Sequence, residues 1–235
     1  MDQAHHTPPA GQAHVLIAVK ELGRAKSRLA ARLGPQERTA LVLAMLRDTL
    51  TAAATATGIA EITVITPDPS VARVARECGA GHYADPAGEG EDRLNAVLRA
   101  AAAHLRSTHG RGPIVALQGD LPCLRPDELS EALAAGTGTP RSFVVDHHGT
   151  GTAALIVGDP EADLDPGFGP DSARRHRLSG AAELTGDWPG LRLDVDTAAD
   201  LDAAVMLGPG RSTAAELDRI GWPGVVGTAR RVRRI

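Results

Sequence analysis

The chain has 235 residues, and its 25 basic and 29 acidic side chains leave a formal net charge of −4, which argues against a general surface for nucleic acid or an anionic membrane. Only 2% of the residues are aromatic, so stacking platforms for single-stranded nucleic acid are not expected. Cys78 and Cys123 make neither a disulfide framework nor a zinc cluster, and no apolar run approaches the roughly 20 residues of a membrane helix. We therefore expect a soluble, cytoplasmic, globular protein.

Short apolar runs alternate with stretches of helical periodicity in the first half of the chain. Such alternation is typical of buried strands connected by helices. Strands are predicted at 13–19, 62–66, 82–84 and 114–118. Helices are predicted from Pro35, from Pro69 after an Asp68 cap to near Gly79, and after a loop at 88–91.

The second half adds a hairpin-like pair of strands at 142–146 and 152–157, joined by a turn at 147–151. The remaining predicted elements are a helix from Pro126 to near Gly136, an irregular segment at 158–170, a short helix capped by Asp171 or Ser172, a strand at 191–195, a helix at 197–206 and a terminal helix capped by Thr213 with Glu216. We expect one α/β domain over 14–227 with a mixed, mostly parallel sheet flanked by helices. Flexible tails are expected at 1–13, which has no signal-peptide core, and at 228–235.

Charged residues gather directly after three predicted strands, where open α/β sheets bind ligands. These residues are Lys20, Lys26, Arg28, Asp120, Asp194 and Asp196. The two lysines are the only ones among 25 basic residues. Carboxylate oxygens suit Mg²⁺, and cations neutralise a polyphosphate. The set therefore predicts Mg²⁺-dependent phosphoryl or nucleotidyl transfer.

Each of these residues also has a structural interpretation. Asp120 suits a turn, Arg28 a solvated surface, and Asp194 with Asp196 a solvated strand end or, for Asp196, a helix cap. The chain lacks both G-x-G-x-x-G and G-x-x-x-x-G-K-[ST], which disfavours a dinucleotide oxidoreductase and a P-loop NTPase. The spacing of three histidines, His147, His148 and His176, does not predict a metal site.

Five segments together resemble a known family. The runs are LIAVKELGRAKSRLA, QGDLPCL, GTGTAAL, FGPDSARRH and LDVDTAADL. In this order and spacing they are similar to the 2-phospho-L-lactate or phosphoenolpyruvate guanylyltransferases of coenzyme F-420 biosynthesis, over roughly residues 14–206. The resemblance implies a Rossmann-like, GT-A-like nucleotidyltransferase fold that is shared with molybdenum-cofactor guanylyltransferases.

The resemblance also implies roles for individual residues. Lys26 and Arg28 match the loop around the GTP triphosphate, with Asn95 and Asp120 on the nucleotide side, and Lys20 lies near the acceptor phosphate. Lys20, Lys26, Arg28 and Asp120 form the catalytic set. Asp120, Asp194 and Asp196 match metal-binding carboxylates, and Thr152, Gly169 and Ser172 the acceptor pocket. Independently, Ser172 begins a predicted helix, where backbone N–H groups favour phosphate. Pro67 and Asp68 could contact guanine or ribose, unless Asp68 only caps its helix.

The implied reaction joins GTP to phosphoenolpyruvate with Mg²⁺ and releases pyrophosphate. The product, enolpyruvyl-diphospho-guanosine, would pass to a downstream transferase. Several alternatives remain at this point. The acceptor could be 2-phospho-L-lactate or another phosphorylated compound, and guanine is not distinguished from adenine. The pair Asp194 and Asp196 is also compatible with a metal-dependent phosphatase, and an inactive binding module is a third class.

Overall fold

A computed structural model describes residues 12–24, 26–85 and 92–224. Its seven strands form one sheet with the order β3-β2-β1-β4-β6-β5-β7. The strands are β1 (Ala13–Ala18), β2 (Ile59–Thr66), β3 (Gly81–Ala84), β4 (Ile114–Leu117), β5 (Ser142–Val145), β6 (Thr152–Val157) and β7 (Ala182–Glu183). Strands β1 to β4 are mutually parallel, whereas β6 is antiparallel to both β4 and β5. This arrangement confirms the predicted mixed, mostly parallel sheet. The predicted loop at 88–91, and the predicted tails apart from residues 12 and 13, lie outside the described residues.

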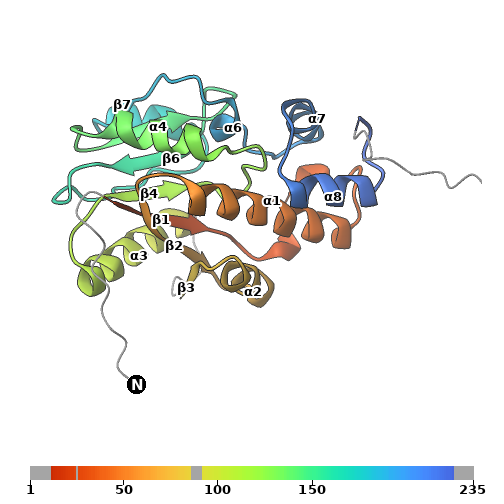
Figure 1. Cartoon of the computed structure of the whole chain (residues 1–235), viewed down its shortest axis with the longest axis horizontal. Coiled ribbons are helices and arrows are strands. Elements are labelled where there is room, and N and C mark those ends of the chain that lie inside the picture. The colour runs from red at the N-terminus through yellow and green to blue at the C-terminus, as the bar shows by residue number, and fades with distance from the viewer. Residues whose placement is uncertain (1–11, 25, 86–91, 225–235) are drawn as a thin grey trace, which may run out of the picture.

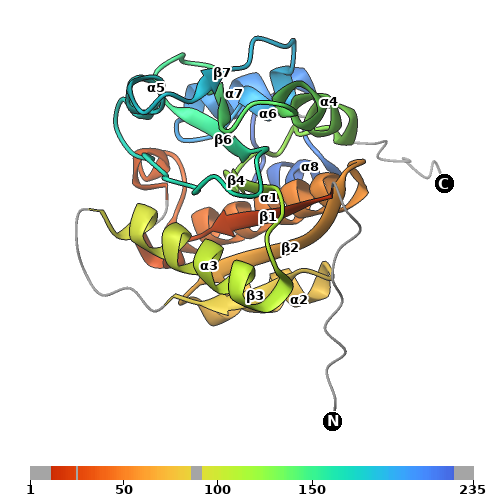
Figure 2. The ribbon, with the colours of Figure 1, turned by 90° about the vertical axis from the view of Figure 1, so that its left-hand side faces the viewer.

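Helices cover both faces of the sheet (Figure 1 and Figure 2). One face packs against α1 (Pro35–Thr55), α2 (Pro69–Glu77), α4 (Pro126–Gly136), α6 (Pro189–Arg192), α7 (Ala198–Leu207) and α8 (Arg211–Arg219). The other face packs against α3 (Arg93–His109), α5 (Ser172–Leu178) and the segment between β6 and α5. Strand β1 is buried on both faces, because Val15 and Ile17 enter the first core and Leu16 the second. None of the helices in the described part of the chain has the length and apolar character to cross a membrane.

The predicted cap of α2 is confirmed. The carboxylate of Asp68 accepts hydrogen bonds from the backbone N–H groups of Ser70 at 2.8 Å and Val71 at 3.4 Å. Its second oxygen accepts a bond from the Leu22 N–H at 3.2 Å. Asp68 therefore fixes the start of α2 and also ties it to the loop after β1, which carries the two lysines.

The strand predicted at 191–195 is wrong. Residues 189–192 form the single turn α6, and the chain then runs extended to Asp196 without joining the sheet. Two backbone N–H groups of α6, those of Gly190 and Leu191, donate to the buried Glu128 carboxylate at 3.0 and 2.8 Å. These N–H groups are therefore satisfied by a side chain from α4, and they do not form the hydrogen bonds to a neighbouring strand that the prediction implied.

The other predicted caps are partly wrong. Helix α8 starts at Arg211, and its first N–H groups, at Ser212 and Thr213, donate to the distant Asp48 carboxylate. The side chain of Asp171 makes no capping bond to α5. The cap of α7 is Thr197, in a capping box with Asp200, and not Asp196. Asp196 is therefore free of the capping role that the sequence allowed.

Candidate active site

Four of the six predicted charged residues line a cavity of about 350 Å³ at the carboxyl ends of β1 and β4, whereas Arg28 and Asp194 are not among its lining residues. The cavity is lined by Lys20, Lys26, Gln118, Asp120 and Asp196, among others. Gly119 allows β4 to approach β1 closely here. A Cβ at Gly119 would lie 3.0 Å from a methyl group of Ile17, so any larger residue would push Asp120 away from the loop after β1.

Lys26 joins three distant segments at this edge. Its ammonium group contacts the Asp120 carboxylate and lies 2.7 Å from Oδ1 of Asp196. The lysine side chain is only 9% exposed, and its backbone has a left-handed φ of 51°, a conformation that costs a residue with a Cβ of order 1 kcal/mol. Burial alone would lower the pKa of Lys26, but the two carboxylates outweigh burial and raise it. Lys26 is therefore a fixed positive charge between two carboxylates.

Asp194 adds a third carboxylate to this group. Its Oδ1 is buried and makes no hydrogen bond among the described residues, although Nδ1 of His147 lies 3.4 Å away. Oδ1 of Asp120 likewise makes no hydrogen bond among these residues. Burial and then the charges of Asp120, Asp146 and Asp196 raise the pKa of Asp194 to about 7. Repulsion of this kind is relieved by a cation, and oxygen-only donors suit Mg²⁺. The carboxylates Asp120, Asp194 and Asp196 therefore fit a divalent hard cation.

The other two predicted cationic residues are more accessible. Lys20 and Arg28 are both exposed, and Lys20 lines the cavity. Arg28 lies in the short 3₁₀ turn Ser27–Leu29, directly after Lys26. The loop thus presents one buried cation to the carboxylates and leaves two others available to solvent or a ligand.

Thr152 lies at the same edge, because the antiparallel β6 begins where β4 ends. The backbone carbonyl of Thr152 accepts a hydrogen bond from the Gln118 amide at 3.2 Å. Its hydroxyl lies 2.9 Å from Nδ1 of His176, and Nε2 of His176 accepts a bond from the Gly167 N–H at 2.9 Å. Since Nε2 is an acceptor, His176 is neutral and donates through Nδ1 to Thr152. His176 thereby connects Thr152 to the segment that carries Gly169.

Asn95 also holds the segment that carries Gly169, through hydrogen bonds to its backbone. Its side-chain amide exchanges two hydrogen bonds with the backbone of Phe168, of 3.0 and 2.7 Å. The structure therefore places Asn95 against the segment that precedes α5, with its side-chain amide bonded to the backbone of that segment. Ser172 is buried at the first position of α5, and Gly169 is exposed with a φ of 119°, which favours glycine.

The neutral state of His176 predicts a pH-dependent stability. Burial lowers the pKa of His176 to about 4, whereas an unfolded histidine titrates near 6.5. The unfolded chain binds the proton first, so folding stability falls as the pH drops from about 6.5 towards 4. Between pH 7.5 and pH 5 the wild type should lose about 2 kcal/mol more than His176→Gln.

Urea unfolding of both proteins at the two pH values measures this difference. His14, whose pKa is also lowered to about 4 by burial, is present in both proteins and cancels in the comparison. An equal loss of stability in the two proteins would show that His176 is not held neutral.

Sequence reasoning missed two residues that border the carboxylates. His147, in the turn after β5, lies with Nδ1 3.4 Å from Oδ1 of Asp194 and with Nε2 3.0 Å from Oδ1 of Asp200. Asp200 is buried in the first turn of α7. The two residues are 53 positions apart. Asp200 lies in the run LDVDTAADL, but nothing in that run indicates a contact with His147, so only the fold reveals it.

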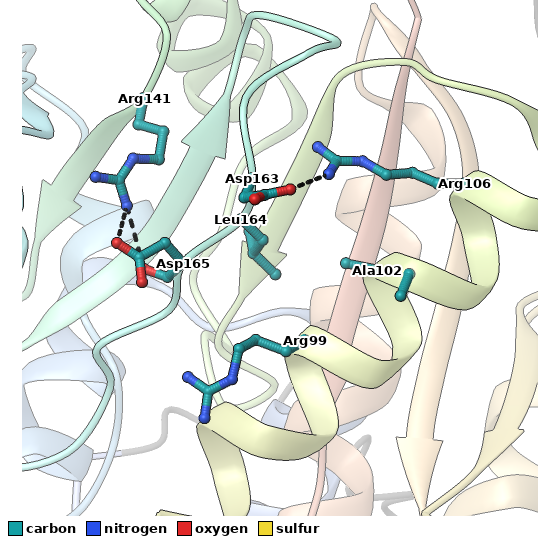
Figure 3. Close-up of a pocket in the computed structure, with 8 residues that line it drawn as sticks. Arg99, Ala102, Arg106, Arg141, Asp163, Leu164 and Asp165 are labelled. Carbon is teal, nitrogen blue, oxygen red and sulfur yellow. Dashed lines mark hydrogen bonds and ion pairs between the residues drawn. The ribbon is translucent and has the colours of Figure 1, made fainter.

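A larger cavity, of about 520 Å³, lies between α3 and the segment 163–165 (Figure 3). It is lined by three arginines, but each guanidinium already pairs with a carboxylate: Arg106 with Asp163, Arg141 with Asp165, and Arg99 with Asp92. Its charge is thus mostly compensated, whereas Oδ1 of Asp120, at the smaller cavity, makes no hydrogen bond among the described residues. The smaller cavity is therefore the better candidate for chemistry.

The likeness to solved structures covers most of the chain. A protein from Desulfovibrio desulfuricans, described as a nucleotide-diphospho-sugar transferase, superposes with a TM-score of 0.62 at 18% identity, over 88% of this chain and 96% of its own. A 4-diphosphocytidyl-2C-methyl-D-erythritol synthase gives 0.57 at 12% identity, over 85% and 99%. At such identities the likeness shows a nucleotidyltransferase fold and no more.

Sequence relatives are much closer. The phosphoenolpyruvate guanylyltransferase of Nocardia farcinica is 58% identical over 209 residues, which cover 89% of this chain and 92% of the relative. That of Rhodococcus opacus is 56% identical over 221 residues, covering 90% and 92%. The family model described as "Guanylyl transferase CofC like" matches residues 13–233. The chain therefore belongs to the CofC-like guanylyl transferase family.

Proposed function

We propose that the protein is a phosphoenolpyruvate guanylyltransferase, which joins GTP to phosphoenolpyruvate and releases pyrophosphate. The observation that carries the proposal is the group formed by Lys26, Asp120, Asp194 and Asp196 at the sheet edge, in a family of guanylyl transferases. The high identity to relatives named phosphoenolpyruvate guanylyltransferase supports this acceptor. The product, enolpyruvyl-diphospho-guanosine, is an activated phosphoanhydride suited to a downstream transferase of coenzyme F-420 biosynthesis.

The chemistry needs no protein nucleophile. An oxygen of the acceptor phosphate, already ionised at neutral pH, attacks the α-phosphorus of GTP. The bond from this phosphorus to the bridging oxygen of the β-phosphate breaks, and its electron pair leaves with pyrophosphate. Catalysis is then mainly positioning and neutralisation of two polyanions. We assign the triphosphate to Lys26 and Arg28, and the acceptor phosphate to Lys20, Thr152, Gly169 and Ser172.

The carboxylates Asp120, Asp194 and Asp196 are the residues that would hold Mg²⁺. A bound Mg²⁺ supplies positive charge that reduces the repulsion between the two reacting anions. Among the described residues, Oδ1 of Asp120 makes no hydrogen bond and is available to such an ion, whereas Oδ1 of Asp194 has the 3.4 Å contact with Nδ1 of His147. Lys26, which touches two of these carboxylates, is placed to exchange them for triphosphate oxygens when the nucleotide enters.

Pyrophosphate release tests the proposal. The protein is incubated with Mg²⁺ and GTP, ATP or CTP, each with and without phosphoenolpyruvate. We expect release that needs GTP and phosphoenolpyruvate together. Equal release with ATP would contradict the guanine assignment. Release of inorganic phosphate from the acceptor without nucleotide would instead favour a metal-dependent phosphatase.

Replacing Ser172 with Ala is expected to raise the KM for the acceptor roughly tenfold or more, with little change in the KM for GTP. A hydrogen bond to a charged phosphate contributes about 1.5–3 kcal/mol. Ser179→Ala is the matched control, because this serine lies at the opposite end of the same helix. A change confined to the GTP dependence would place Ser172 on the nucleotide side.

A further inference from the structure

Three side chains that the proposed reaction does not use come together beside the carboxylates. They are His147 and His148, in the turn between β5 and β6, and Asp200, in the first turn of α7. One ligand atom from each lies within 4.8 Å of the others. The two histidines direct Nε2 towards the same oxygen, Oδ1 of Asp200, at 3.0 and 3.3 Å. Their rings lie 3.8 Å apart.

These separations match those between ligands of one metal ion. Nitrogen and oxygen ligands about 2.0–2.1 Å from Zn²⁺ in a tetrahedron lie about 3.3 Å from each other. Two imidazoles with one carboxylate are a common donor set for Zn²⁺ and related ions. Imidazole nitrogen disfavours Mg²⁺, which prefers oxygen. The donor set therefore differs in kind from the three carboxylates of the proposed active site.

The second oxygen of Asp200 holds the carboxylate in place. Oδ2 accepts hydrogen bonds from the backbone N–H groups of Asp196 and Thr197 at 2.9 and 2.7 Å. This capping leaves Oδ1 directed at the histidines. The carboxylate is thus oriented before any ion binds, and its side chain is only 3% exposed.

His147 is oriented in a similar way. Its backbone N–H donates to the carbonyl of Arg192 at 2.8 Å, and its Nδ1 lies 3.4 Å from Oδ1 of Asp194. A histidine that binds a metal through one nitrogen typically donates from the other to a carboxylate, which orients the ring. The 3.4 Å contact between Nδ1 of His147 and Asp194 is similar to this arrangement, and it leaves Nε2 of His147 directed at Oδ1 of Asp200.

We propose that His147, His148 and Asp200 form a binding site for a divalent transition-metal ion of the Zn²⁺ class. Three protein ligands leave a coordination position open, and the 59% exposed side chain of His148 places that position next to solvent. The bound ion orients His147 against Asp194, and so links this site to the carboxylates of the active site. The proposal concerns metal binding alone and does not depend on the reaction assigned above.

Co²⁺ is a direct probe, because it replaces Zn²⁺ and its visible d–d absorption reports its coordination geometry and ligand field. The titration uses metal-free protein without nucleotide. The chain has a second adjacent histidine pair, His5 and His6, so the parent protein for this experiment carries His5→Ala and His6→Ala. His148→Ala removes one ligand from an exposed position, and Asp200→Asn removes another. His104→Ala, at an exposed histidine on α3, is the matched control.

We expect the parent and the His104→Ala variant to bind one Co²⁺ with visible absorption that excess Mg²⁺ does not remove. His148→Ala and Asp200→Asn should each weaken binding at least about tenfold, the lower end of what even an outer-shell change costs. Unchanged binding by His148→Ala would overturn the proposal, as would displacement of Co²⁺ by Mg²⁺. A parent that binds no Co²⁺ or Zn²⁺ would overturn it as well. All these readouts are independent of GTP and of the acceptor, so they stand whether or not the proposed reaction is correct.

Discussion

Replacing Asp120 with Asn is expected to lower turnover about 10²–10³-fold in a protein that remains folded. Losing one preorganised electrostatic contact at a reacting centre typically has this effect. The carboxylate of Asp120 touches Lys26, and its Oδ1 makes no hydrogen bond within the described part of the chain. Asn keeps the size of the side chain and leaves the backbone carbonyl, which accepts a bond from the Val195 N–H, but it removes the negative charge that would hold Mg²⁺.

The measurement is turnover across a Mg²⁺ titration, with circular dichroism to check folding. Asp196→Asn should behave similarly, because its carboxylate also contacts Lys26. Asp218→Asn is the matched control, since Asp218 is an exposed carboxylate on α8. Normal turnover at ordinary Mg²⁺ for both Asp120→Asn and Asp196→Asn would remove these residues from the metal site.

Replacing Lys26 with Ala is expected to have two opposite effects. The KM for GTP should rise about 10–100-fold, because a charged hydrogen bond to the triphosphate is lost. Mg²⁺ binding without nucleotide should become tighter, since the ammonium group no longer lies between Asp120 and Asp196. A competing cation at the same carboxylates must be displaced before the metal ion binds.

Calorimetric Mg²⁺ titration of the nucleotide-free protein separates these effects from activity. Lys20→Ala is the control, because it removes the same charge from the same cavity without breaking the Lys26 ion pairs. Weaker Mg²⁺ binding by Lys26→Ala would mean that the lysine supports the metal site. Similar GTP effects from both variants would mean that total charge, and not the position of Lys26, determines nucleotide affinity.

Much of the fold follows from local sequence signals. The buried run of β1 and the Asp68-Pro69 start of α2 lie where the sequence predicts them, because burial and capping act on neighbouring residues. The sequence predicts a strand at 191–195, but this segment begins with the last two residues of α6 and then runs outside the sheet. The contact that decides this comes from Glu128, more than 60 positions earlier, and a local pattern does not include it. The start of α8 differs for the same reason, because its cap is the distant Asp48.

In the candidate active site, too, some contacts were predictable from the sequence and others were not. The meeting of Lys26 and Asp120 was predictable, since each follows a strand and ligand sites lie beyond strand ends. Asp196 reaches the same edge although the strand predicted before it does not form, because the Val195 N–H donates to the carbonyl of Asp120 at 3.1 Å. The contacts of Asn95 with the Phe168 backbone were not predictable, because they depend on the course of an irregular segment. The proximity of His147 and His148 to Asp200 was also not predictable from the sequence. Two adjacent histidines do not have the sequence spacing of a known metal-binding motif. The third residue, Asp200, lies in α7, far along the chain.

Direct competition between two acceptors tests the central claim. The protein is given GTP, Mg²⁺ and equal amounts of phosphoenolpyruvate and 2-phospho-L-lactate, and the two guanosine diphospho-linked products are quantified by mass. Both acids present the same carboxylate and phosphate. They differ only in shape, because phosphoenolpyruvate has a planar methylene group where 2-phospho-L-lactate has a tetrahedral carbon that carries a methyl group. A shape difference of this size is worth about 1–3 kcal/mol, or 10–200-fold. We predict an excess of the enolpyruvyl product within that range. An excess of the lactyl product would contradict the acceptor assignment, and the formation of neither product by folded protein would contradict the guanylyltransferase assignment itself.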